Sequence, residues 1–522
     1  MALAITVVRI NGTTEEFQVG ENATIDEGLI SNKETVASVI IPEGVTTIGK
    51  SAFDGCTALY AISLPRGLTS IGLVAFSECV SLVSISIPRS VTTIEAFSFD
   101  RCMSLTSITL PAGLTKITVG IFVNCIRLVS VVIPETVTSI EGKAFAGCGR
   151  LRTISIPTGV TSIGRDAFFK CVSLASISLP AGLTTIERHT FRQCTSLASI
   201  ILPEGLTTIQ PIAFEGCTSL ALINLPASLT TIEFRAFKGC SSLASITIPE
   251  GVTEIHGGTF AGCTSLASVT LPVGVTKIGG AAFDGCFSLA SITLPEGVTK
   301  IGGGAFSECT SLASITLPEG VTTIGENAFS GCASLASISI PKTVTTLGNG
   351  VFSECRPFYL EMPARFKDRL TNESENYQNG VIFDTFSDER QMITLSNHPS
   401  LLLVKLTPDT AEGTAEYIAG TRLVQLKSRI DLARGRTGAI EAAPTPVSRA
   451  FPMRFVTDTI VRSPDLPMAR QLRDYYTKVA VTLQRLGISA VPIQIVLNYL
   501  FNVEPGRNRS IDWTKRLPLM NQ

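Results

Sequence analysis

A ladder of cysteines constrains the fold of this 522-residue chain more than any other feature. All 14 cysteines, from Cys56 to Cys355, follow one another at intervals of 23 residues. A proline ladder that begins at Pro42 and a phenylalanine ladder that begins at Phe53 keep the same interval. A fixed period of this length is typical of a repeat protein in which every unit has the same local structure. Fourteen such units occupy residues 42–363.

The spacing within one unit predicts its local structure. In the copy that contains Ser311–Leu317, apolar and small polar residues alternate, which favours a short strand with one buried face. Pro318 ends that strand, because proline has no N–H to donate to a ladder. The stretch from Val321 to Ile324 predicts a second short extended piece. The alanine, phenylalanine and cysteine that follow stand at i, i+1 and i+4, which indicates one helical or 3₁₀ turn.

A single 23-residue unit cannot bury its own apolar face, whereas stacked units can. The sequence therefore predicts a β-rich repeat solenoid with short helical turns, followed by a C-terminal region rich in helix with some strand. The positions expected to be buried in every coil are those of Val45, Ile48, Ala52, Phe53, Cys56, Leu59, Ile62 and Leu64.

The repeat has the consensus P-x-G-V-T-x-I-G-x-x-A-F-x-G-C-x-S-L-x-S-I-x-L and resembles the BspA-like leucine-rich repeats. The resemblance covers residues 42–363 and implies a leucine-rich-repeat superhelix. Proteins of this family include cell-surface adhesins and many members without an established role, so the resemblance implies little about function beyond an adhesin role. We therefore expect a non-catalytic protein-interaction scaffold, with a BspA-type adhesin as the alternative.

Changes in the residue pattern indicate the boundaries between the repeats and the other predicted parts of the chain. The first residues form two β-rich runs around Asn11–Gly12, which predicts a hairpin with a type I′ turn. The predicted parts are a hairpin cap and partial first coil over 1–41, the repeats over 42–363, a mixed strand and helix region over 364–434, a linker over 435–450 and a helical region over 451–522.

Composition and charge narrow the classes of partner. Charged residues make up 16% of the chain and the net charge is −1, which argues against a nucleic-acid partner. The charge is uneven, because residues 1–363 carry a net −6 and residues 364–522 a net +5. The beginning of the sequence lacks the pattern of a secretory signal, and no apolar run reaches the length of a membrane helix. These observations predict a cytoplasmic protein without membrane insertion, with a surface location as the alternative.

A row of basic residues interrupts the repeat in copies six to nine. These residues flank the predicted helical turn, where they would form a basic stripe along one edge of the solenoid. Contact with an acidic partner protein is one interpretation, and ordinary solvated charge is the other. The outward strand positions, mostly Ser and Thr, predict a solvated face. The stripe consists of Arg165, Lys170, Arg188, His189, Arg192, Arg235 and Lys238.

Two patterns in the repeats imitate sites of chemistry. Gly44–Ser51 matches the phosphate-loop pattern G-x-x-x-x-G-K-[ST], yet it is an ordinary copy of the repeat in which Val45 and Ile48 should be buried. The cysteines stand one to a coil in a line, with no C-x-x-C pair, so they do not predict a zinc site or a nucleophile. We expect fourteen free buried thiols, no cofactor, no metal and no enzymatic activity.

Two amphipathic helices are predicted near the C-terminus. The first ends at Gly487, and the second begins near Pro492. Either they pack within a small domain or against the last coils, or they form a docking helix pair. The stretch VPIQIVLNYLFN resembles the opening helix of an F-box, which would imply a ubiquitin-ligase adaptor. The residues predicted to face a docking partner are Leu472, Tyr476, Val479, Leu483, Val496, Leu500 and Phe501.

Overall fold

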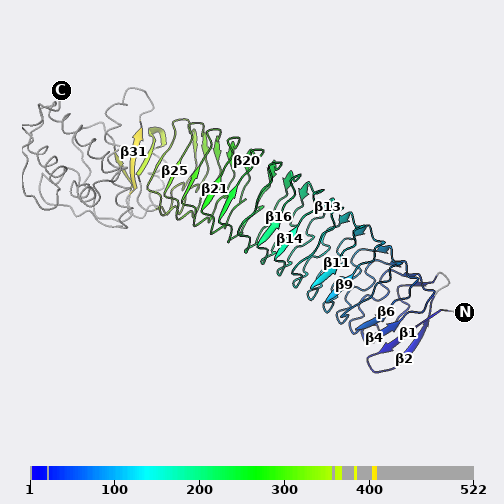
Figure 1. The fold of residues 1–522 in the computed structure, drawn as a ribbon. Coiled ribbons are helices and arrows are strands. Elements are labelled where there is room, and N and C mark those ends of the chain that lie inside the picture. The colour runs from blue at the N-terminus through cyan, green and yellow to red at the C-terminus, as the bar shows by residue number, and fades with distance from the viewer. Residues whose placement is uncertain (1–2, 20–22, 356–358, 367–380, 385–401, 408–522) are drawn as a thin grey trace, which may run out of the picture.

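The repeats fold into a solenoid in which each copy is one coil. The computed structural model describes residues 3–19, 23–355, 359–366, 381–384 and 402–407. Figure 1 shows the coils stacked side by side into a curved rod, with the N-terminal hairpin at one end. The predicted repeat solenoid is therefore confirmed.

Every copy contributes a strand to an outer row along the rod, and all copies except two, five and eight contribute one to an inner row. In Figure 1, β9, β11, β14, β16 and β21 lie toward the inner side of the arc, whereas β13 and β20 lie toward the outer side. The inner row consists of β4 (Val36–Ile40), β6 (Ala61–Ser63), β9 (Ser107–Thr109), β11 (Ser130–Val132), β14 (Ser176–Ser178), β16 (Ser199–Ile201), β19 (Ser245–Thr247), β21 (Ser268–Thr270), β23 (Ser291–Thr293), β25 (Ser314–Thr316) and β27 (Ser337–Ser339). The outer row consists of β3 (Thr24–Ile25), β5 (Thr47–Ile48), β7 (Ser70–Ile71), β8 (Thr93–Ile94), β10 (Lys116–Ile117), β12 (Ser139–Ile140), β13 (Ser162–Ile163), β15 (Thr185–Ile186), β17 (Thr208–Ile209), β18 (Thr231–Ile232), β20 (Glu254–Ile255), β22 (Lys277–Ile278), β24 (Lys300–Ile301), β26 (Thr323–Ile324) and β28 (Thr346–Leu347).

Both rows are parallel and paired in the register of the repeat. On the inner row, Ser291 lies opposite Ser314, and on the outer row Lys300 lies opposite Thr323. Every residue therefore stacks on its own counterpart in the next coil, about 4.8 Å away. A residue type that is repeated in the sequence becomes a column in the structure.

Three columns fill the core. The phenylalanines form a continuous stack from Phe53 to Phe352, with neighbouring ring centroids 5.3 to 5.9 Å apart. The cysteine column runs beside it, and the Sγ of Cys309 donates a hydrogen bond to the carbonyl oxygen of Phe283 in the preceding coil at 3.2 Å. The third column is that of the leucines, such as Leu312, which are fully buried.

The segment expected to be a helical turn is a series of hydrogen-bonded turns instead. Ser51 and Gly55 have φ values of 53° and 75°, which a right-handed helix does not contain. Alternate N–H groups in this segment donate to the following coil, as Phe53 does to the carbonyl oxygen of Ala75, whereas Asp54 and Cys56 donate to carbonyl oxygens within the segment. In the described part of the chain, 3₁₀ helix occurs only at η1 (Lys33–Thr35) and η2 (Ala364–Phe366). The prediction failed because side-chain spacing does not reveal backbone hydrogen bonds between coils.

A hairpin covers the N-terminal end of the stack. The strands β1 (Ala4–Arg9) and β2 (Thr14–Gln18) are antiparallel, and β1 also pairs antiparallel with β4. The hairpin loop has three residues, because the Arg9 N–H donates to the carbonyl oxygen of Thr13 and the Gly12 N–H donates back to that of Arg9. Gly12 alone has a positive φ in this loop, so the turn carries a glycine bulge rather than the expected type I′ geometry.

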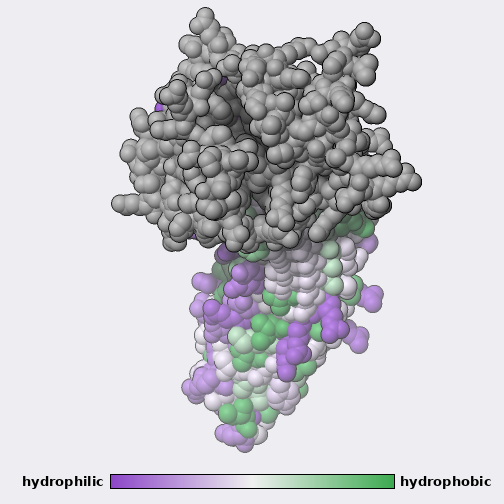
Figure 2. Space-filling view, turned by 90° about the vertical axis from the view of Figure 1, so that its left-hand side faces the viewer, coloured by the Kyte–Doolittle hydropathy of each residue, from purple (hydrophilic) through white to green (hydrophobic). Residues whose placement is uncertain are grey.

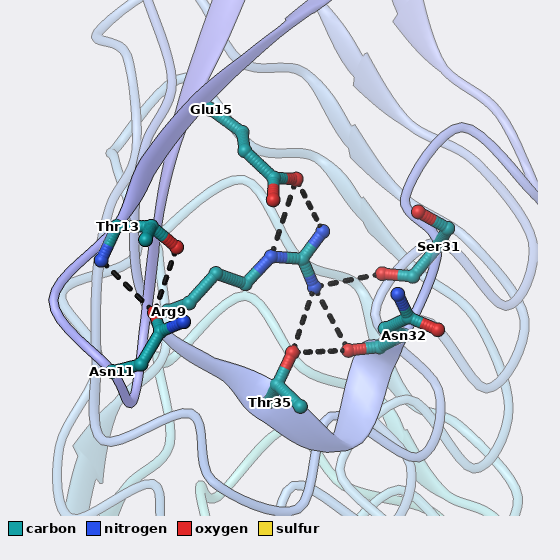
Figure 3. A network of polar contacts seen from close by, with 7 residues as sticks. All are labelled: Arg9, Asn11, Thr13, Glu15, Ser31, Asn32 and Thr35. Carbon is teal, nitrogen blue, oxygen red and sulfur yellow. Dashed lines mark hydrogen bonds and ion pairs between the residues drawn. The ribbon is translucent and has the colours of Figure 1, made fainter.

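Arg9 ties this hairpin to the first coil (Figure 3). Its side chain is 5% exposed and pairs with Glu15 at 2.6 Å. The Nη1 group donates to the carbonyl oxygens of Ser31 and Asn32, both at 2.8 Å, and to the Thr35 hydroxyl at 3.0 Å. A buried guanidinium with this many acceptors holds the hairpin over the N-terminal edge of the inner sheet, which would otherwise be unpaired.

The inner sheet continues beyond the last cysteine. The strand β29 (Tyr359–Pro363) pairs with β27, and β31 (Leu402–Thr407) pairs with β29. The strand β30 (Val381–Asp384), which falls in a stretch expected to be extended, then pairs with β31. The predicted linker and the helical region over residues 451–522 lie outside the described residues.

Candidate protein-interaction ridge

The seven basic residues singled out in copies six to nine lie on the turn segments between the outer and inner rows. We call this surface the basic ridge, and it consists of Arg165, Lys170, Arg188, His189, Arg192, Arg235 and Lys238. Copies six and seven contribute the first five of these residues, which are neighbours. Copy eight has Pro211, Ile212 and Glu215 at the corresponding positions, so it separates Arg235 and Lys238 from the others by one coil.

The backbone of the turn segment turns these side chains outward. Asp166, Lys170 and His189 all have φ values of 58–59°, in the left-handed region. Their N–H groups are used between coils: Asp166 donates to the carbonyl oxygen of Arg188 and Lys170 to that of Arg192. The ridge residues therefore sit on a backbone that is held by its neighbours on both sides.

Asp166 organises copies six and seven. Its side chain is 11% exposed, and its Oδ1 and Oδ2 lie 3.0 Å from His189 Nδ1 and 3.3 Å from Arg165 Nε. Arg188 Nε donates to His189 Nε2 at 3.4 Å. A carboxylate accepts hydrogen bonds and a guanidinium donates them, so Nδ1 of His189 faces an acceptor and its Nε2 faces a donor. One carboxylate thus positions two arginines, one of them through the imidazole.

Aromatic rings position the remaining cations. The Lys170 ammonium lies 5.2 Å from the ring centroid of Phe169, and the Arg192 guanidinium lies 5.7 Å from the same ring. Arg192 also has Glu215 Oε2 at 3.3 Å from its Nε. In copy nine, the Arg235 guanidinium lies 4.6 Å above the ring of Phe234. These contacts reduce the side-chain freedom that binding would otherwise have to remove.

In the coils that follow, the corresponding positions carry no basic side chain. Copies ten to twelve have glycine at Gly257 and Gly258, at Gly280 and at Gly303 and Gly304. The charged and aromatic side chains of copies six to nine therefore form a local feature on one stretch of the rod. No interaction with a partner has been tested, and the ridge stays a prediction.

The cysteine thiols lack the properties of reactive or metal-binding thiols. All fourteen cysteines are free, and thirteen are buried. Burial raises the pKa of Cys194 and of Cys309 from the ordinary value of 9.0 to about 12. A thiol that resists ionisation is a poor nucleophile and a poor metal ligand. Within the described residues, no three His, Cys, Asp or Glu side chains gather as a metal site would require.

The stretch Gly44–Ser51, which matches the phosphate-loop pattern, is an ordinary part of the solenoid. Val45 and Ile48 are fully buried, and Ile48 belongs to the outer strand β5. The carbonyl oxygen of Ser51 accepts a hydrogen bond from Lys33 Nζ at 2.7 Å. This stretch therefore has the extended and turned backbone of every other copy, in place of an anion-binding loop.

Sequence reasoning missed that the inner row is not uniform. The consensus describes its outward positions as small and uncharged, which is true of copies nine, ten, twelve and thirteen. Copies one to five instead expose Tyr60, Val129 and Val132, together with Arg150 and Arg152. Comparison of each copy with the consensus at these positions would have found them.

The residues predicted to form a C-terminal docking pair lie outside the described part of the chain. They are Leu472, Tyr476, Val479, Leu483, Val496, Leu500 and Phe501. Across the described ranges, no helix has the length and apolar character needed to cross a bilayer.

Comparison with known proteins places the repeats in a family. A family model for the BspA type leucine rich repeat region, six copies long, matches residues 23–148, 115–244 and 230–358. No curated protein matches the chain. A leucine-rich repeat protein from Bacteroides ovatus is 26% identical with a TM-score of 0.56, over 73% of this chain and 97% of its own. A leucine rich cell surface protein from Faecalibacterium prausnitzii is 29% identical with a TM-score of 0.40, over 64% of this chain and 92% of its own. The matches to the family model together span well over half of the sequence, and the chain belongs to the BspA-type leucine-rich-repeat family.

Proposed function

We propose that the chain is a non-catalytic protein-interaction scaffold, and that its basic ridge contacts an acidic partner protein. The observation that carries this proposal is the set of positioned cations on copies six to nine. Arg165, Lys170 and Arg188 are exposed, and their charged groups are positioned by Asp166, by the ring of Phe169 and by His189 respectively.

The charge of the surroundings makes the ridge a distinct target. Residues 1–363 carry a net charge of −6, so a cluster of cations is an exception on this solenoid. An acidic surface would be repelled by most of the rod and attracted by the ridge, which favours one docking position. Rigid coils add to this effect, because little backbone order has to be gained on binding.

A comparison of charge-reversal variants of the full chain tests the proposal. Arg165→Glu with Arg188→Glu reverses the exposed charge of the ridge, and Arg89→Glu with Lys300→Glu makes the same change elsewhere on the solenoid. We expect proteins captured by the wild-type chain and by the control to be lost or reduced about tenfold with the ridge variant. Quantitative mass spectrometry of the captured proteins measures this. Equal capture by all three chains would refute a role of the ridge.

Two further measurements address the wider function. We propose a cytoplasmic location, and imaging of the tagged full-length chain tests it; a surface location would favour the adhesin alternative. Proximity labelling by the same chain tests the partner class. Enrichment of ubiquitin-ligase subunits that depends on Leu500 would favour the F-box alternative, whereas their absence would remove it.

A further inference from the structure

The outward surface of the inner row has an unusual distribution of charge. In each copy this surface is formed by the seven residues that follow the cysteine. Over copies one to thirteen, those stretches contain no Asp or Glu, and their only charged residues are Arg127, Arg150 and Arg152. All three arginines are exposed, and they fall in copies four and five.

Exposed apolar side chains lie on both sides of these arginines along the inner row, in copies one to four and again at Val172, Ile201 and Leu222 in copies six to eight. Tyr60 is 58% exposed and Val132 is 57% exposed. In copies nine, ten, twelve and thirteen, the corresponding positions hold only Ala, Ser and Thr. Figure 2 looks along the rod from its C-terminal end and shows a pale strip in the middle of the visible side near the grey residues, with purple and green areas beside it and farther away. The apolar members of the patch are Tyr60, Val83, Met103, Ile126, Val129 and Val132.

The register of the coils makes this one continuous patch. Arg127 and Arg150 occupy the same position in consecutive copies, so their Cα atoms stack about one strand spacing apart, near 4.8 Å. Arg152 continues the column that contains Tyr60, Val83 and Val129. Backbone hydrogen bonds connect this column, because the N–H of Val129 donates to the carbonyl oxygen of Thr106 at 2.8 Å, and Thr106 in turn donates to Val83 at 3.1 Å.

We propose that this patch binds a linear segment of a partner protein that combines Asp or Glu with apolar side chains. Arginine forks bind carboxylates in pairs of hydrogen bonds, and the three arginines have no carboxylate on their own face to compete. The neighbouring valines and Tyr60 supply apolar area that a partner can remove from water. Tyrosine and arginine are also the residues that most often dominate binding energy at interfaces.

The charge of the whole solenoid favours a protein segment over a nucleic acid. Three arginines on a surface of net charge −6 over residues 1–363 give little counterion release, on which nucleic-acid binding depends. A short acidic segment needs only local complementarity and gains from the apolar neighbours. The patch lies on copies one to five of the inner row and shares no residue with the basic ridge, so the two surfaces can be tested separately.

Selection from a phage library of random linear peptides tests this proposal on the full-length chain. We expect enriched peptides to contain Asp or Glu next to Leu, Ile, Val or aromatic residues. Binding of synthetic copies, followed by fluorescence anisotropy, should weaken about tenfold or more in Arg150→Glu with Arg152→Glu. Val129→Ser should weaken it several-fold without a change in the charge of the chain.

Matched controls separate the patch from general electrostatics. Arg165→Glu with Arg188→Glu changes the charge equally on the ridge and should leave peptide affinity within about twofold of wild type. Thermal unfolding followed by circular dichroism should be the same for all variants, since the substituted side chains are exposed. The proposal is overturned if no acidic and apolar peptides are enriched, or if the ridge variant loses as much affinity as the patch variant.

Other occupants would give different results, each of which also overturns the proposal. Tighter binding of single-stranded oligonucleotides than of the selected peptides, lost on reversal of Arg150 and Arg152, would assign the patch to nucleic acid. Sedimentation that shows a dimer of the wild-type chain and a monomer of the Val129→Ser variant would assign it to a second copy of this chain.

Discussion

The buried cysteines predict that the solenoid unfolds in mild alkali. Burial raises the pKa of Cys56, Cys194, Cys263, Cys309 and Cys355 from 9.0 to about 12, and it raises the pKa of the other nine well above 9.0. The unfolded chain therefore releases its thiol protons first as the pH rises. The stabilisation is fully present below pH 9 and is lost progressively as the pH approaches the folded-state pKa values.

The size of the loss follows from the pKa differences. Each pH unit above 9 lowers the free energy of unfolding by about 1.4 kcal/mol for every thiol that stays protonated in the folded state. The five cysteines with a pKa of about 12 together lose about 7 kcal/mol per pH unit, and all fourteen lose about 20 kcal/mol. A typical domain is stable by about 5–15 kcal/mol, so the repeats should unfold within one to two units above pH 9.

Simultaneous measurement of circular dichroism and of thiolate ultraviolet absorbance tests this reasoning. In reducing buffer, the strand signal should disappear over the same pH interval in which thiolate absorbance appears. The variant with Cys240→Ala, Cys263→Ala and Cys286→Ala is the control for other alkaline titrations. It should be less stable at neutral pH, because the Sγ–H donors are lost. Above pH 9, its unfolding free energy should fall by about 4 kcal/mol less per pH unit than that of the wild-type chain, because three titrating thiols are absent. Thiolate absorbance that rises while the strand signal persists would refute the argument, as would equal slopes in the two chains.

Two substitutions test the core column and the N-terminal cap, with urea unfolding as the measurement. Phe237→Ala removes a fully buried ring from the stack and should cost about 3–5 kcal/mol, whereas Phe234→Ala in the same copy, where the ring is 42% exposed, should cost less than about 1 kcal/mol. Arg9→Met removes a buried guanidinium that donates to Glu15, Ser31, Asn32 and Thr35 and should cost about 1–3 kcal/mol, whereas Arg89→Met at an exposed position should be nearly neutral. Equal costs within either pair would contradict the corresponding assignment.

The buried positions could be predicted from the sequence because a solenoid converts period directly into space. Val45, Ile48, Phe53 and Cys56 are each fully buried, as their recurrence every 23 residues required. Ile62 and Leu64, which were also expected to be buried, are only partly buried in the first copy. Apolar pattern was sufficient here because it depends on which side chains face inward, and that is a local property.

Contacts between coils could not be predicted in the same way. The cysteine was interpreted as a small apolar filler, yet its Sγ also donates to a carbonyl oxygen of the preceding coil, as Cys263 does to Phe237 at 3.2 Å. That carbonyl belongs to a residue 26 positions earlier, and no motif in one copy identifies it. The prediction of a helical turn failed for the same reason, because alternate N–H groups of that segment donate to the next coil.

The ridge and the inner patch differ in how far the sequence could reveal them. Charged residues in copies six to nine stand out against glycine in later copies, so the ridge was visible as a departure from the repeat. Val129 and Arg152 both depart from alanine at their position, but the consensus of all fourteen copies concealed them because eight of the other copies have alanine there. In a solenoid, a residue that breaks the column neither adds to the core nor disturbs the stack when it faces solvent. Such a residue is a candidate contact for a partner, and we propose this role for Arg152 on the inner row and for Arg188 on the ridge.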